Sequence, residues 1–136
     1  MTTDTKTIHD FISEHNITIS SEWADRNPHM DDSASMDNYK CRLRANGRQM
    51  TLYFSKGIAH HGVAPEADEV LDCLASDAAG FENAQGFEDW ASEYGYDTDS
   101  RKAERIYATV ERQAAKLKTL LGEDAYRQLL WDMERL

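Results

Sequence analysis

The sequence predicts an α+β fold, in which an N-terminal helix and a small three-stranded antiparallel sheet precede a helical C-terminal half. Two observations predict it. Residues 38–55 alternate apolar and polar side chains around an Asn-Gly pair, and residues 65–136 carry apolar side chains at helical spacing. With 136 residues we expect a single domain, 1–136, made of a helix-and-sheet part, 1–63, and a helical part, 64–136.

The first 37 residues predict a helix, a strand and a loop. Residues 5–15 form a short helix, because their apolar side chains lie three and four positions apart, and Asn16 ends it. Residues 17–24 begin with β-branched side chains and predict the first strand. Residues 25–37 are polar and small, and Asn27-Pro28 opens a loop there.

A β-hairpin is the strongest local prediction. Strands over 38–45 and 48–55 flank Asn46-Gly47, the pair typical of a two-residue type I′ turn. Apolar residues alternate along both strands and predict one buried face. The opposite face carries a basic patch: Lys40, Arg42, Arg44 and Arg48. Residues 56–64 then form the crossover loop to the helices.

Pro65 suits the first turn of the next helix, since its missing N–H costs nothing there. Gly80 is expected to end this helix. The apolar stripe consists of Val70, Leu71, Leu74 and Ala78. The acids expected on the opposite, solvent-facing side are Asp68, Glu69 and Asp72.

Three further helices are predicted. A short one over 87–94 lies between two glycines, and the longest runs to Leu121 with Asp97 or Asp99 as its N-cap. Gly122 interrupts the pattern, and Ala125, Leu129, Leu130 and Met133 define a last helix that runs to the C-terminus. Aromatic residues with the spacing or surroundings of core positions are Trp23, Phe87, Trp90, Tyr94 and Trp131.

Acidity is concentrated in one stretch. Residues 64–104 hold twelve acidic and two basic residues, a net charge of −10 that equals the charge of the whole chain. Such a surface disfavours direct binding to nucleic acid and favours a basic partner. Carboxylates on successive helical turns lie about 5–6 Å apart, a crude likeness of a phosphate array. The expected partner-binding residues are Glu66, Asp68, Glu69, Asp72, Asp77, Glu82, Glu88, Asp89, Glu93, Asp97 and Asp99. The alternative is a solvated helical face that keeps the chain soluble.

Catalytic and metal motifs are absent from the sequence. The residue types of a nucleophilic catalytic triad are present in Ser55, His60 and Asp68, but the sequence has no nucleophile elbow of the G-x-S-x-G kind. Possible metal ligands are His29, His60, His61 and Cys73, without the spacing of a metal-binding motif. We therefore expect no enzyme, no cofactor and no bound metal. The alternative that stays open is a small metal-dependent enzyme around His60 and His61.

The chain carries no long apolar run and no signal-peptide pattern, so we expect a cytoplasmic protein that does not interact with membranes. In that compartment Cys41 and Cys73 are expected to be reduced and buried.

Two stretches, TLYFSKGIAHHG (51–62) and FEDWASEYGYDTDSRKAERIY (87–107), resemble small acidic proteins carried by phages and mobile elements. The size, acidity and lack of catalytic motifs are similar to those of anti-defence proteins of phages, including anti-CRISPR proteins and anti-restriction DNA mimics. The resemblance implies an inhibitor in the cytoplasm of a bacterial or archaeal host. It would bind the basic surface of a nucleic-acid-handling defence complex and occlude its nucleic-acid site with acidic, DNA-mimicking helices. A second alternative is an adaptor module that binds through the sheet.

Overall fold

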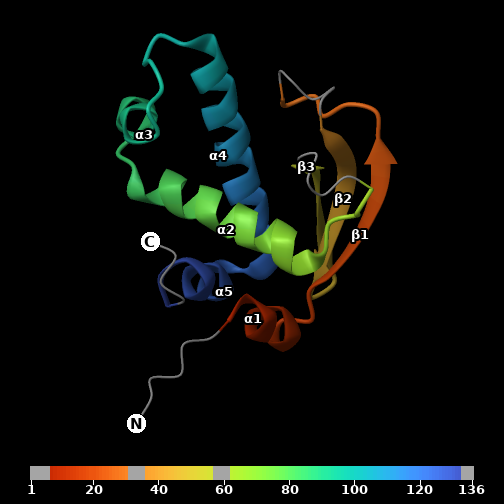
Figure 1. Ribbon diagram of the computed structural model, residues 1–136. Coiled ribbons are helices and arrows are strands. Elements are labelled where there is room, and N and C mark those ends of the chain that lie inside the picture. Colours follow the sequence, from red (N-terminus) through yellow and green to blue (C-terminus); the bar gives the residue numbers. More distant parts are fainter. Residues whose placement is uncertain (1–6, 31–35, 57–61, 133–136) are drawn as a thin grey trace. The chain divides into compact units, whose positions relative to one another are not determined.

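The computed structural model describes residues 7–30, 36–56 and 62–132. The chain forms two compact units, the sheet unit, Lys6–Asp72, and the helical unit, which includes Cys73–Leu136 (Figure 1). An N-terminal helix, a three-stranded antiparallel sheet and a helical C-terminal half confirm the predicted α+β class. The single-domain organisation stays a prediction.

Helix α1, Ile8–Glu14, starts at a capping box that the sequence analysis did not identify. The Thr7 hydroxyl accepts a hydrogen bond from the Asp10 amide, and the Asp10 carboxylate accepts one from the Thr7 amide, both at 3.1 Å. Phe11 anchors the helix and is fully buried. The predicted stop at Asn16 is confirmed, because this residue adopts a left-handed conformation with φ 50°.

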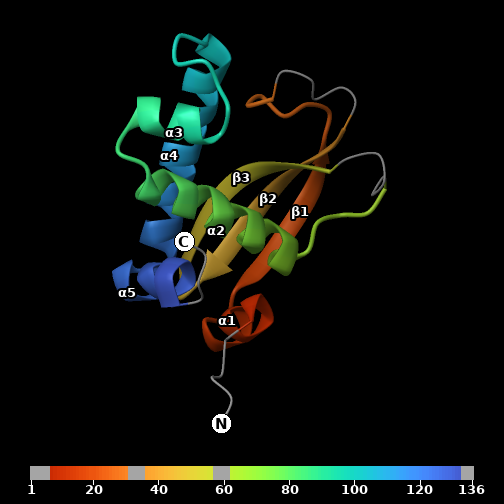
Figure 2. The ribbon, with the colours of Figure 1, turned by 60° about the vertical axis from the view of Figure 1, so that its left-hand side comes forward.

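Strands β1 (Thr18–Ala24), β2 (Asp37–Ala45) and β3 (Arg48–Lys56) form one antiparallel sheet in the order β1-β2-β3, with β2 in the middle (Figure 2). Asn46 and Gly47 connect β2 to β3 with φ values of 54° and 76°. Positive φ at both central residues is what a type I′ turn requires, so the predicted hairpin and its turn are confirmed.

The register of the sheet separates apolar from basic side chains. Rows of paired residues such as Ile19–Leu43–Met50 and Ser21–Cys41–Leu52 cross the three strands. One face is buried through Tyr39, Cys41, Leu43, Ala45, Met50 and Leu52. The other face carries Lys40, which is half-buried, and Arg42 and Arg44, which are exposed. The predicted alternation is therefore confirmed. The prediction that Arg48 belongs to the basic patch is wrong, because it pairs with Ala45 and so lies on the other side of the sheet from Arg42 and Arg44.

Helix α2, Ala67–Asn83, crosses from the sheet unit into the helical unit. The prediction that Gly80 ends this helix is wrong, because the helix continues for three more residues. Glycine is needed at this position for a different reason: a Cβ atom here would collide with the phenol of Tyr94. Helix α3, Phe87–Glu93, follows between Gly86 and Gly95, as predicted.

Helix α4, Arg101–Leu121, is the longest element, and its predicted end at Gly122 is confirmed, with φ 86° at that glycine. The prediction of Asp97 or Asp99 as N-cap is wrong. Ser100 caps the helix, since its hydroxyl accepts a hydrogen bond from the Ala103 amide at 3.2 Å.

The C-terminal segment bears out the predicted last helix only in part. It begins as helix α5, Glu123–Arg127, and continues as a π-helical turn, Gln128–Asp132. Its predicted continuation to the C-terminus, over residues 133–136, lies outside the described residues. Buried side chains of α4, α5 and this turn belong to the core: Ala103, Val110, Ala114, Leu117, Leu120, Leu121, Ala125, Tyr126, Leu129 and Leu130.

The turn allows a direct stability test. Gly47→Val should lower the free energy of unfolding by about 1 kcal/mol or more, because a β-branched residue resists positive φ. No other atom lies within 4 Å of the position of a Cβ there, so the loss would come from the backbone. Urea unfolding measures it. Asn46→Gly, which keeps positive φ accessible, is the control; equal stability of Gly47→Val and wild type would contradict the turn assignment.

Candidate functional site

The helical unit presents a group of exposed carboxylates with no basic residue among them. Between residues 84 and 100 the chain has five acids and no Lys or Arg. All five are exposed. We call them the acidic surface: Glu88, Asp89, Glu93, Asp97 and Asp99.

An aromatic cluster supports the acidic surface. Trp90 of α3 is 4% exposed, and its ring stacks on Tyr96 with 5.4 Å between centroids and 9° between planes. The rings of Phe87 and Tyr107 also lie against Trp90, at 6.4 Å and 5.2 Å. The core role expected for Trp90 is therefore confirmed, and its contacts hold the short helix α3 in place. Tyr94 remains 49% exposed at the edge of the cluster.

A shallow groove of about 180 Å³ borders the acidic surface. It lies between the end of α2 and helix α3, and its lining residues are Gly80, Asn83, Ala84, Asp89, Glu93 and Tyr94. Because Gly80 has no side chain, the Tyr94 phenol lies directly against the α2 backbone. The groove therefore combines two carboxylates with one face of a partly exposed aromatic ring.

Two carboxylates of α3 have opposite effects on the stability of this helix. Asp89 accepts a hydrogen bond from the Gln85 amide at 2.9 Å and lies in the first turn, where the helix dipole favours negative charge. Glu93 lies in the last turn, where the dipole disfavours it, and four residues after Asp89, where like charges repel. Glu93 is thus unfavourable for the helix that carries it.

Two other predicted partner-binding acids of this unit make internal contacts. Glu82 accepts a hydrogen bond from the Tyr126 hydroxyl at 3.3 Å. Burial raises the pKa of the Tyr126 phenol, and the negative charge of Glu82 adds to this effect. Burial also raises the pKa of Asp77, whose Oδ2 lies 4.0 Å from the Sγ atom of Cys73. Both acids therefore have roles within the helical unit.

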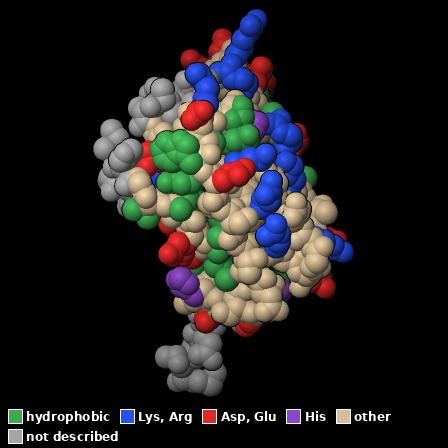
Figure 3. Space-filling model, turned by 90° about the vertical axis from the view of Figure 1, so that its right-hand side faces the viewer, with side chains coloured by type: hydrophobic (Ala, Val, Ile, Leu, Met, Phe, Trp, Pro, Cys, Tyr) green, Lys and Arg blue, Asp and Glu red, His purple; other side chains and the backbone are tan. Residues whose placement is uncertain are grey.

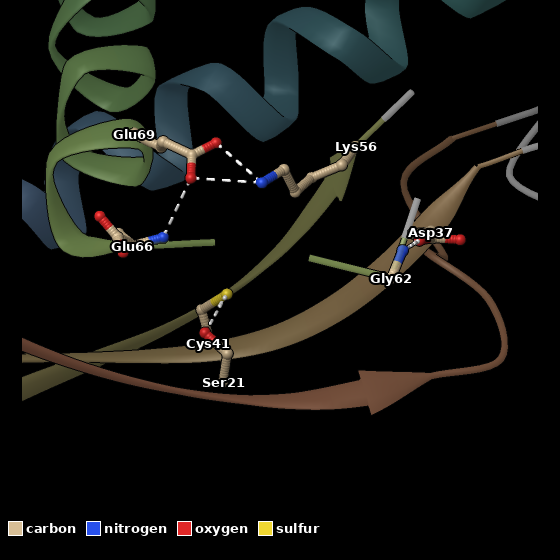
Figure 4. Close-up of polar contacts among 7 residues, drawn as sticks. All are labelled: Ser21, Asp37, Cys41, Lys56, Gly62, Glu66 and Glu69. Atoms are coloured by element: carbon tan, nitrogen blue, oxygen red, sulfur yellow. Dashed lines mark hydrogen bonds and ion pairs between the residues drawn. The ribbon is translucent and has the colours of Figure 1, made fainter. Parts of the chain in front are cut away.

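The remaining four predicted acids belong to the sheet unit. The expectation that Asp68, Glu69 and Asp72 face solvent is met only in part, because all three are half-buried. Glu69 forms an ion pair with Lys56, whose side chain is 4% exposed, at 3.1 Å (Figure 4). Asp68 lies 3.6 Å from the His9 imidazole. Glu66 is exposed, and its amide donates to Glu69 Oε1 at 3.3 Å.

The sequence analysis missed a buried polar network in the sheet unit. Ser55 donates to Asn38 Oδ1 at 2.6 Å and accepts from Asn27 Nδ2 at 3.0 Å, and both asparagines are buried. Nearby, the buried Asp37 accepts a hydrogen bond from the Gly62 amide (Figure 4). These bonds tie loop residues to the ends of β2 and β3. Asn27-Pro28 marked the loop in the sequence, but not its distant partners.

The candidate catalytic and metal-binding residues are not brought together where the structure describes them. Within residues 7–30, 36–56 and 62–132, no three His, Cys, Asp or Glu side chains lie close enough to hold a metal ion. His60 and His61 fall outside these ranges. Ser55 takes part in the buried network, and Asp68 lies beside His9 instead.

Four side chains expected in the interior lie at the surface. Trp23 is 56%, Tyr94 49% and Trp131 43% exposed, so the core role predicted for these three is wrong. Trp23 lies near the end of β1 and contacts only the edge of the Tyr39 ring among the described aromatic pairs. Cys41 is buried as predicted, whereas Cys73 is exposed; neither thiol forms a disulfide. Burial raises the pKa of the Cys41 thiol.

None of the helices described is both long and apolar enough to cross a membrane. No protein-family model matches the chain, and no curated protein or solved structure shows a significant match to it.

The aromatic cluster predicts unequal roles for two tryptophans. Trp90→Ala should lower the free energy of unfolding by about 3–5 kcal/mol, because it leaves a cavity among packed rings. Trp131→Ala, the control in the same unit, should cost less because Trp131 is 43% exposed, against 4% for Trp90. Chemical denaturation followed by circular dichroism measures both. Equal losses would contradict the cluster as the support of α3.

The ion pair between Lys56 and Glu69 predicts a difference in stability between two variants. Glu69→Ala leaves the buried Lys56 ammonium without its carboxylate and should cost about 1–3 kcal/mol. Lys56→Met combined with Glu69→Leu removes both charges and should cost less than the single change. Urea unfolding of the three proteins measures this order. A double variant less stable than Glu69→Ala would show that the pair itself contributes to stability.

Proposed function

We propose that the protein acts by binding, not by catalysis, and that it is a phage-type inhibitor of a host nucleic-acid-handling defence complex. The acidic surface would occupy the basic site at which that complex holds DNA or RNA. The observation that carries the proposal is the set of five exposed acids, without a basic residue among them in the sequence, on helix α3, which the Trp90 cluster holds, and on the loop that follows it.

Electrostatics supports this choice of surface. Asp89 and Glu93 lie one helical turn apart, about 5–6 Å, and Asp97 and Asp99 follow in the next loop. Carboxylates that the fold fixes at such a spacing attract a basic surface that binds phosphates. Glu93 weakens its own helix, so its presence is better explained by an interaction with a partner than by stability.

The contacts of the eleven predicted acids favour a smaller set for a binding test. Contacts within the chain are made by Asp68, Glu69, Asp77, Glu82 and Asp89. Asp72 is half-buried in the sheet unit. Changes at these positions would affect folding as well as binding. The better place for a binding test is therefore Glu88, Glu93 and Asp97, which are exposed residues of the acidic surface.

The proposal predicts a loss of binding without a loss of stability. The triple variant Glu88→Gln, Glu93→Gln, Asp97→Asn removes three exposed charges and should change stability by only about 0.5 kcal/mol. Immobilised wild type should capture nucleic-acid-binding proteins from a bacterial lysate, and salt or duplex DNA should release them. The triple variant should capture far less, as measured by quantitative mass spectrometry.

The matched control is Lys40→Gln, Arg42→Gln, Arg44→Gln, which removes three charges from the sheet face and should capture the same proteins as wild type. Capture that survives in the acidic variant and is lost in the sheet variant would contradict the proposal. It would assign binding to the sheet, as in the adaptor alternative.

A further inference from the structure

The outer face of the sheet carries a row of cations that has no use in the proposed function. Lys40, Arg42 and Arg44 follow one another at every second position of β2, so they lie about 7 Å apart along the strand. Lys and Arg side chains gather on the face of the molecule that carries the strands (Figure 3).

The neighbours of this row are almost all neutral. Arg42 pairs with Ser20 on β1 and with Thr51 on β3, and Arg44 pairs with Thr18 and Gln49. Arg44 donates a hydrogen bond to the Gln49 side chain at 3.3 Å. Glu22, opposite Lys40, is the one acid in these pairs. Arg42 and Arg44 are both exposed, so the positive charge at that end of the row is largely uncompensated.

The chain itself carries a complementary surface. We propose that the basic row of one copy binds the acidic surface of a second copy, so that the protein associates head to tail. Asp89 and Glu93 lie about 5–6 Å apart on their helix, close to the spacing of the cations, and long Arg side chains can accommodate the difference. Glu88 and Asp97, which belong to the same acidic surface, are exposed as well. This inference does not rest on the proposed function, because neither surface requires a host partner.

The length of the row favours this occupant over a nucleic acid. Three cations span about 14 Å along β2, and helix α3, with seven residues, is about 10 Å long. A nucleic-acid strand would extend beyond the row and meet the other charges of a chain whose net charge is −10. The mutual repulsion of two such chains is screened over about 8 Å at physiological ionic strength, whereas contacts between the two patches are shorter.

Because the two patches differ, the contact is heterologous and leaves one free patch on each end of a dimer. Sedimentation equilibrium of the full chain tests it over a range of protein concentrations. At low salt the average mass should rise above that of the monomer as concentration increases, and at high salt it should return to the monomer value. A monomer under all of these conditions would overturn the proposal.

A charge exchange tests which surfaces meet. Arg42→Glu with Arg44→Glu, and separately Glu88→Arg with Glu93→Arg, should each abolish self-association. Mixed together, the two variants should associate again, because the unchanged acidic surface of the first meets the unchanged basic row of the second and the two reversed patches are also complementary. Melting temperatures confirm that both remain folded. A mixture that stays monomeric although wild type associates would overturn the proposed pairing.

The same variants test whether the basic row binds a single-stranded nucleic acid instead of a second copy. A labelled single-stranded oligonucleotide should not bind wild-type protein. Binding of this probe that is lost in Arg42→Glu with Arg44→Glu would overturn the proposal and assign the basic row to a phosphate backbone.

Discussion

The register between β2 and β3 is the constraint on which the sheet unit depends. Two residues, Asn46 and Gly47, set it, because a two-residue turn leaves no freedom in how the flanking strands pair. A slip by one position would turn Cys41 and Leu43 toward solvent and Arg42 toward the core. The same turn therefore determines both the buried face of the sheet and the basic row on its other face.

In the helical unit, the acidic surface depends on an interaction of another kind. Helix α3 has only seven residues, and an isolated helix of that length is not stable in water. Its packing comes from Trp90 and the rings around it, and Glu93 reduces its stability. Tertiary contacts thus hold a dense group of carboxylates in place. If copies associate head to tail, the same carboxylates are covered, and self-association competes with binding to a host partner.

Local chemistry explains which parts of the fold could be predicted from the sequence. The hairpin, the start of α3 after Gly86 and the end of α4 at Gly122 depend on neighbouring residues and were predicted correctly. Gly80 was taken for a helix end, whereas its role depends on a ring fourteen positions away. Asp97, Asp99 and Ser100 are all suitable N-caps, and local sequence did not decide among them.

Only the negative charge of the candidate site could be predicted from the sequence. The composition located the acidic stretch, and the five acids of the acidic surface are exposed. The sequence did not show that Glu69 pairs with Lys56, or that Glu82 meets Tyr126, because these partners lie 13 and 44 positions away. Helical spacing alone placed Asp68 and Glu69 on a solvent face, since it takes no account of the sheet beside that helix.

The central claim is that this fold separates its charges into an acidic surface and a basic row. Paramagnetic relaxation of assigned amide signals tests it directly, with a cationic, a neutral and an anionic soluble probe. The cationic probe should broaden the signals of residues 87–99 most, and the anionic probe those of Lys40, Arg42 and Arg44, relative to the neutral probe. Equal broadening of both regions by the two charged probes would contradict the claim.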